Sequence, residues 1–134
     1  MSSIFTKIIN GDIPCYKIAE NDYFIAFLDI FPVREGHVLV VPKTEVDYIF
    51  DLPDEILARW LIFSKPIAHA IEKSFSCRRV AISVIGLDVP HAHMHLVPVN
   101  SSADLNFARE KIKLSDDRLL EIQQKILENL VSSF

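Results

Sequence analysis

Residues 91–96 alternate histidine with apolar residues, and this alternation constrains the fold more than any other feature of the chain. Successive side chains of an extended strand point to opposite faces of a sheet. An extended segment here therefore places His91, His93 and His95 on one face and three apolar side chains on the other. Because the apolar side chains need a core, we expect the histidines to face a cleft or solvent.

Four further segments have the composition of strands. Two of them flank a polar turn at residues 20–22 and are expected to form a hairpin. Another is a β-branched run that Pro42 ends. With the histidine segment included, the expected strands are residues 15–19, 23–28, 37–41, 79–85 and 91–99.

Three helices are expected around these strands. Residues 4–10 form a short one, capped by Ser2 or Ser3 and ended by Gly11. A long helix begins near Asp54, with apolar residues three and four positions apart, and Pro66 is expected to kink or split it. A C-terminal helix covers about 114–131. This order of elements indicates an α+β fold with a mainly antiparallel sheet of about five strands around one long central helix.

The composition restricts the function and the location of the chain. Its 134 residues fit one domain, residues 1–134. A net charge of −4 argues against a general affinity for nucleic acid. The N-terminus lacks a signal-peptide pattern, and no apolar run reaches the roughly 18 residues that a membrane span needs. Cys15 and Cys77 lie far apart, as is typical of reduced thiols in a cytoplasmic protein.

Three interpretations of the histidine segment remain open on the residues alone. It can be a structural ladder of imidazoles. It can be a zinc or copper site, although same-face residues of a strand lie about 6.8 Å apart and would have to converge strongly on one ion. It can also be a catalytic site, because neutral imidazole is nucleophilic at pH 7 and its neighbours can fix its tautomer. Catalysis of this kind fits phosphoryl chemistry, where positioning and stabilisation of oxygen charge dominate.

The pattern at residues 91–97, three histidines separated by single apolar residues and followed by two more, resembles the signature of the histidine triad (HIT) family. Residues 3–14, 27–30 and 36–43 agree with the same family. The resemblance covers residues 3–98 and is strongest to the small bacterial and Hint-like members. It implies a HIT-like fold and a homodimer in which the sheet continues across the interface and the helix from Asp54 supplies much of the contact.

The resemblance also implies roles for four histidines. His93 would attack the α-phosphorus of a purine nucleoside phosphate derivative, and water would then release AMP or GMP from a nucleotidyl-histidine intermediate. His95 would hold phosphate oxygens, His91 would buttress the strand, and His37 would lie beside the nucleophile. This mechanism needs no metal ion and no other cofactor.

A nucleotide site is implied by the same resemblance. Asp29 would accept hydrogen bonds from the ribose hydroxyls, although an aspartate here is also typical of a turn. The base would lie in an apolar slot, and without the resemblance its residues read as ordinary core. The slot residues are Phe5, Ile8, Phe27, Ile30 and Leu39, and the remaining nucleotide-binding candidates are Gly86 and Val89.

Two departures from the family pattern affect the expected chemistry. Some relatives bind structural zinc through an N-terminal Cys-x-x-Cys, whereas Ser3 and Thr6 stand at those positions, so no structural zinc is expected. Relatives often carry neutral donors in the loop before the triad, whereas this chain has Leu87 and Asp88. An ionised Asp88 would repel phosphate at short range, which leaves the leaving group open.

Three functions are therefore carried forward. The first is hydrolysis of nucleoside phosphoramidates or related nucleotidyl substrates. The second is hydrolysis of dinucleoside polyphosphates, which uses the same chemistry on another leaving group. The third is a nucleotide-binding regulatory module with little turnover.

Overall fold

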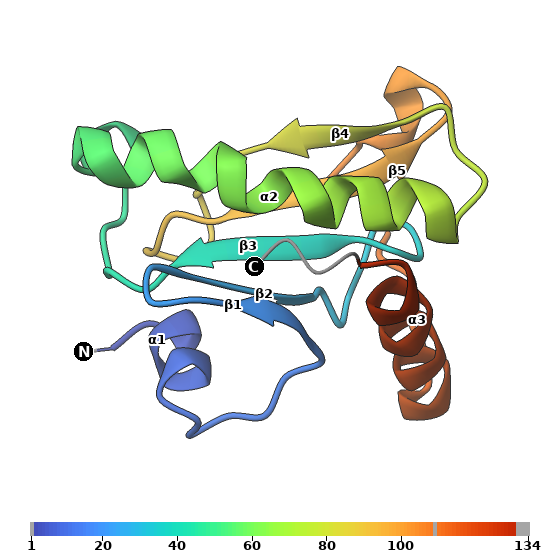
Figure 1. Cartoon of the computed structure of the whole chain (residues 1–134), viewed down its shortest axis with the longest axis horizontal. Helices are drawn as coiled ribbons and strands as arrows, with labels where there is room; N and C mark the ends of the chain where they lie inside the picture. Colours follow the sequence, from blue (N-terminus) through green and yellow to red (C-terminus); the bar gives the residue numbers. More distant parts are fainter. Residues whose placement is uncertain (1, 109, 131–134) are drawn as a thin grey trace.

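The computed structural model describes residues 2–108 and 110–130 of the chain. Within them the chain forms a five-stranded sheet of order β1-β2-β3-β5-β4, with every neighbouring pair antiparallel, and three α-helices (Figure 1). The strands are β1 (Lys17–Glu20), β2 (Phe24–Leu28), β3 (Val38–Pro42), β4 (Arg79–Ser83) and β5 (Met94–Val99). The helices are α1 (Ile4–Ile9), α2 (Asp54–Ser74) and α3 (Asp116–Asn129). The predicted α+β class and its arrangement of helices are confirmed.

The alternation along the central strands produces two apolar layers, one on each face of the sheet. One layer is the main core, where α2 and α3 pack against the sheet; its strand residues include Phe24, Ala26, Leu28, Val38, Val40, Met94 and Leu96. Trp60 of α2 fixes this contact by donating its indole N–H to Val40 O at 3.2 Å. The other layer lies under α1 and contains Phe5, Ile25, Phe27, Leu39 and Val41. One face of the sheet thus carries the main core, and the opposite face carries the smaller apolar layer together with the histidines.

The helix α2 runs without a break through Pro66, so of the two predicted effects of this proline, a kink or a split, the split is wrong. Proline removes one backbone hydrogen bond, whose acceptor in a regular helix is the carbonyl four residues earlier. That carbonyl belongs to Ile62, which is exposed to water. The buried contacts of Phe63 and Ile67 on the opposite side hold the helix together across the missing bond.

Two strands are shorter in the structure than the sequence predicts. The strand expected at residues 79–85 ends at Ser83, and the one expected at 91–99 begins at Met94. The backbone before Met94 finds partners in loops instead of in a neighbouring strand, because His91 N donates to Val89 O and Ala92 N donates to Val46 O, both at 2.8 Å.

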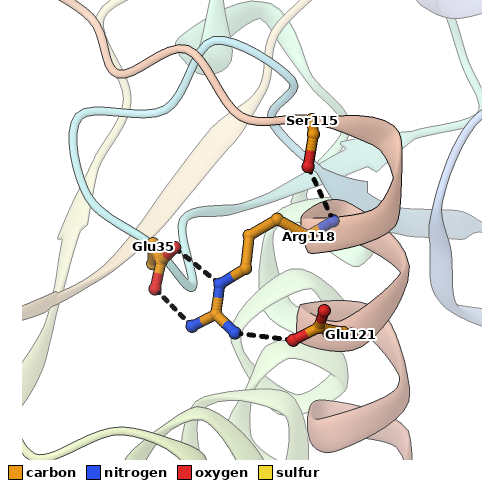
Figure 2. A network of polar contacts seen from close by, with 4 residues as sticks. All are labelled: Glu35, Ser115, Arg118 and Glu121. Carbon is orange, nitrogen blue, oxygen red and sulfur yellow. Dashed lines mark hydrogen bonds and ion pairs between the residues drawn. The ribbon is translucent and has the colours of Figure 1, made fainter.

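The C-terminal helix is tied to the loop that leads into β3 (Figure 2). Arg118 of α3 binds both carboxylate oxygens of Glu35, from Nε at 2.8 Å and from Nη2 at 2.6 Å. The same guanidinium donates to Glu121 at 3.0 Å, and Ser115 caps the helix by accepting from Arg118 N at 3.1 Å. Among the described residues, no helix has the length and apolarity to cross a bilayer.

Candidate active site

Four histidines come together where β3 and β5 lie side by side. His37 immediately precedes β3, and His95 lies in β5 opposite Leu39 of β3. His91 and His93 lie in the segment that leads into β5. The predicted alternation holds through this segment, because Ala92, like Met94 in β5, belongs to the main core.

The histidines are more enclosed than the prediction of a cleft or solvent suggested, because each of the four is less than a tenth exposed. Phe5 of α1 covers one end of the cluster, with its ring centroid 4.9 Å from that of His93 and 5.8 Å from that of His91. Phe107 covers the other end, with its ring centroid 4.5 Å from that of His95. Aromatic side chains from opposite ends of the sequence therefore wall the cluster.

The hydrogen bonds of His37 fix the tautomers of two rings. Val33 N donates to His37 Nδ1 at 3.2 Å, so the proton of the neutral ring is on Nε2. This Nε2–H donates to His95 Nδ1 at 2.9 Å, which leaves the His95 proton on Nε2 as a donor for a ligand oxygen. Burial lowers the pKa of His37 to about 3 and that of His95 to about 4, and the charge of Lys111 contributes in the same direction. Both rings are neutral at pH 7.

The tautomer of His93 is fixed by its own backbone. Its Nδ1 lies 2.8 Å from His91 O, and because a carbonyl only accepts, Nδ1 carries the proton. In the neutral ring Nε2 then has a lone pair and can act as a nucleophile. Burial lowers the pKa of His93 below its usual value, which keeps the ring in this form.

Asp29 lies beside the histidines at the end of β2. Its Oδ1 accepts from Phe31 N at 2.9 Å, and its Oδ2 lies 3.7 Å from His37 Nε2. Burial raises the pKa of this carboxyl group, while the hydrogen bond from Phe31 and the charge of Lys111 lower it. The carboxylate can accept hydrogen bonds from a polar ligand next to the imidazoles.

Most of the predicted apolar nucleotide-binding residues gather around α1, but Ile30 of the slot and the separate candidate Gly86 do not. Phe5, Phe27 and Leu39 are buried together, and Ile8 and Val89 pack against them. Ile30 is about half exposed and lies outside this cluster. Gly86 also lies outside it; its φ of +72° is a left-handed conformation that favours glycine.

One group of side chains has the composition of a metal site. Ligand atoms of Asp29, His37 and His95 all lie within 4.8 Å of one another. However, His37 uses Nδ1 to accept from Val33 and Nε2 to donate to His95. A metal ion on His37 Nε2 would displace this proton to Nδ1, against the Val33 N–H. The geometry therefore favours a hydrogen-bonded pair of imidazoles over a ligand set.

Several residues near the histidines were not anticipated from the sequence. Phe107 and Lys111 lie in an irregular segment after β5, and Lys111 Nζ donates to Phe107 O at 2.6 Å. The segment is fastened to the loop before β3 by a bond from Ile112 N to Pro32 O at 2.9 Å. Neither residue belongs to a periodic pattern, so no local signal pointed to the site.

The loop before the histidines places one carboxylate near the nucleophile. The charge of Asp88 raises the pKa of His93, although burial outweighs it. Leu87 next to it is almost fully exposed. Of Leu87 and Asp88, only Asp88 carries a charge, and this charge acts on His93.

Comparisons with known proteins agree on one family. A family model described as the HIT domain matches residues 10–102. An adenosine 5′-monophosphoramidase of Schizosaccharomyces pombe is 39% identical over 99 residues, which cover 73% of this chain and 74% of that protein.

Two solved structures have the same fold along nearly the whole chain. A HIT-like protein of Bartonella henselae superposes with a TM-score of 0.84 at 29% identity, covering 96% of each chain. A zinc-bound histidine triad family protein of Mycobacterium smegmatis superposes with a TM-score of 0.81 at 30% identity, covering 97% of this chain and 94% of the other.

Proposed function

Because this chain belongs to the HIT family of nucleotide-binding hydrolases, we propose that it hydrolyses nucleoside phosphoramidates or related nucleotidyl substrates with His93 as the nucleophile. The observation that carries this proposal is the hydrogen bond between His93 Nδ1 and His91 O, since it leaves Nε2 free to attack. The name of the S. pombe relative supports a phosphoramidate as the substrate.

The proposed reaction has two displacements at the α-phosphorus. His93 Nε2 forms a bond to phosphorus while the phosphorus–nitrogen bond breaks, and the amine departs with that electron pair and a proton taken from solvent. Water then attacks the phosphorus and gives up a proton to solvent, the bond to Nε2 breaks, and AMP or GMP is released. The first step makes a covalent intermediate and divides one difficult displacement into two easier ones.

In this proposal the groups around His93 bind different portions of the nucleotide. His95 Nε2–H would donate to a phosphate oxygen, and the positive charge of Lys111 would favour the anion. Asp29 would accept from the ribose hydroxyls. The apolar cluster around Phe5 would contact the purine, and His37 would hold His95 in the required tautomer.

The decisive experiment measures AMP release from adenosine 5′-phosphoramidate and from diadenosine tetraphosphate. His93→Ala should lower the rate at least about 10³-fold, because it removes the nucleophile. His69→Ala is the matched control, since His69 is an exposed histidine of α2. Equal activity of His93→Ala and the wild type would reject His93 as the nucleophile.

Two observations support alternative functions within the same site. The charge of Lys111 near His95 would also suit the anionic leaving group of a dinucleoside polyphosphate. A preference for the tetraphosphate in the same assay would select that function. The carboxylate of Asp88 near His93 instead suits a regulatory module that binds nucleotide with little turnover. AMP binding without product from either substrate would select the module.

We also propose that the protein is a cytoplasmic homodimer. The edge strand β4 and the exposed side of α2 would form the interface, so that two sheets continue into one. Ile62 of α2 and Ile82 of β4 are at least half exposed and offer apolar surface for this contact.

A further inference from the structure

A polar cluster joins the start of α1 to His91. Ser3 Oγ lies 2.7 Å from His91 Nδ1 and Thr6 Oγ1 lies 3.5 Å from it. Glu45 Oε1 accepts from Ser3 N at 2.7 Å and from Thr6 Oγ1 at 2.6 Å. His91 is fully buried and Ser3 is nearly so, so these bonds stand in for hydration that both side chains lose.

The direction of each hydrogen bond in the cluster follows from groups that can only donate or only accept. His91 Nε2 lies 2.7 Å from Pro42 O, so Nε2 carries the proton and Nδ1 of the neutral ring must accept. The donor to Nδ1 is then the hydroxyl of Ser3. Ser3 Oγ accepts from Thr6 N at 3.0 Å and also lies 3.3 Å from Thr6 Oγ1. Its contact with His91 Nδ1 is shorter, at 2.7 Å, so the hydroxyl proton is assigned to the histidine.

Glu45 holds Ser3 in place for this bond. Its hydrogen bonds from Ser3 and Thr6 lower the pKa of the carboxyl group, so Glu45 is ionised at neutral pH. An ionised carboxylate only accepts, which keeps the Ser3 backbone N–H and the Thr6 hydroxyl directed toward it.

The cluster reaches the nucleophile through one carbonyl group. His91 O accepts from His93 Nδ1 at 2.8 Å, so the residue whose ring Ser3 contacts also holds the nucleophile. The same α1 that carries Ser3 also carries Phe5, whose ring packs against His93. A displacement of α1 or of the His91 ring would therefore change the surroundings of His93 on two sides.

We infer that Ser3, held by Glu45, is a positioning residue for His93. Its hydroxyl fixes the position of the His91 ring, whose proton the Pro42 carbonyl holds on Nε2, and the His91 carbonyl then fixes the proton of the nucleophile on Nδ1. The inference rests on the proposed function for its catalytic consequence, whereas the tautomers themselves are independent of turnover.

The test combines ¹⁵N NMR of the imidazole nitrogens with steady-state kinetics on adenosine 5′-phosphoramidate. In the wild type we expect His91 protonated on Nε2 and His93 protonated on Nδ1. Ser3→Ala should keep the His91 proton on Nε2, because Pro42 O still accepts it. It should give mixed tautomers at His93 and lower kcat about tenfold, with KM within about twofold. Ser3→Thr keeps the hydroxyl and should restore both readouts.

Ser3→Ala also removes the cap of α1, so loss of a cap needs its own control. Ser115→Ala removes the equivalent cap of α3 and should leave the His93 tautomer and kcat unchanged. Wild-type tautomers and wild-type kcat in Ser3→Ala would overturn the inference, as would an equal effect of Ser115→Ala. If the wild type hydrolyses neither substrate, the proposed function fails, while the NMR measurement still decides whether Ser3 controls His93.

Discussion

At the scale of single residues, the four buried histidines differ in what their hydrogen-bond partners allow. His37 and His95 carry their protons on Nε2, whereas His93 carries its proton on Nδ1. Backbone groups decide these tautomers, because Val33 N can only donate and His91 O can only accept. One cluster of identical side chains thus supplies both a hydrogen-bond donor and a nucleophile.

The pH dependence of activity should report the form of His93. Burial lowers its pKa below the usual value near 6.5, so the neutral nucleophile persists under mildly acidic conditions. We expect kcat/KM for adenosine 5′-phosphoramidate, corrected for spontaneous hydrolysis, to fall with a midpoint below pH 6.5. Asp88→Asn removes a charge that raises this pKa and should move the midpoint lower still. A wild-type midpoint at or above 6.5 would contradict the assignment.

Acid should destabilise the fold through the same residues. The unfolded chain binds a proton at each histidine below about pH 6.5, whereas folded His37 and His95 resist protonation down to about pH 3 and 4. The unfolded state therefore binds more protons in this window, and the free energy of unfolding falls as the pH falls. Between pH 6.5 and 5 we expect the free energy of unfolding, measured by urea denaturation, to fall by about 2 kcal/mol for each ring.

Two histidine variants separate this effect from the titration of carboxylates. His95→Gln should flatten the loss of stability between pH 6.5 and 5, because it removes one of the two rings whose pKa lies near 3 or 4. His69→Gln changes an exposed histidine and should keep the wild-type slope. Identical slopes in both variants would show that the buried rings are not responsible.

How far the sequence predicted the site depended on the kind of residue. The four histidines and Asp29 belong to compact motifs, and the structure brings them together. The sequence predicts Ser3 as a helix cap and as a position where a zinc ligand is missing, but not as a partner of His91, which its hydroxyl binds. Glu45, Phe107 and Lys111 lie in irregular segments, and their proximity to the histidines arises from tertiary contacts that no local pattern encodes.

At the scale of elements, periodicity predicted the strands and helices well, and backbone hydrogen bonding set their ends. The apolar face of α2 appears in the sequence as residues three and four positions apart, and those residues are buried. The expected break at Pro66 fails because packing of one face outweighs a single missing bond. The early start expected for β5 fails because alternation of side chains does not require a strand partner. The backbone N–H groups of His91 and Ala92 donate to loop carbonyls instead.

The contact between Arg118 and Glu35 should stabilise α3 on the loop before β3 (Figure 2). A bidentate guanidinium–carboxylate pair is more specific than a single-contact ion pair, although both side chains here are partly exposed. Arg118→Ala should increase hydrogen exchange of the α3 amides and lower the melting temperature by no more than a few degrees. Arg59→Ala removes an ion pair within α2 and is the matched control. Unchanged α3 exchange in Arg118→Ala would show that the contact does not hold the helix.

At the scale of the whole molecule, the main core and the histidine cluster lie on opposite faces of the sheet. Its α2 face holds the main core, including Trp60, Ile67 and Ile71, while the opposite face carries the histidines between α1 and Phe107. The net charge of −4 gives no general attraction for a phosphate. Under the proposed function, local donors such as the His95 Nε2–H and the ammonium group of Lys111 would therefore bind the anion.

The proposed homodimer follows from the edge of this sheet and can be tested with one substitution. Strand β4 has a neighbour on one side only, and its Ile82 shares the strand face of Val80, which packs against the α2-side core. Exposed Ile82 therefore lies on the same side of the sheet as exposed Ile62 of α2, so both can meet a second copy.

Burying this apolar surface is the main source of stability for such an interface. Sedimentation of the wild type at micromolar concentration should give close to twice the chain mass of 15.3 kDa. Ile62→Glu would bury a charge in the contact and should give the single-chain mass, because an unpaired buried carboxylate is costly. Leu120→Glu changes an exposed leucine of α3, away from β4, and should remain a dimer. A wild-type mass near 15.3 kDa would reject the dimer, and a dimeric Ile62→Glu would move the interface away from α2.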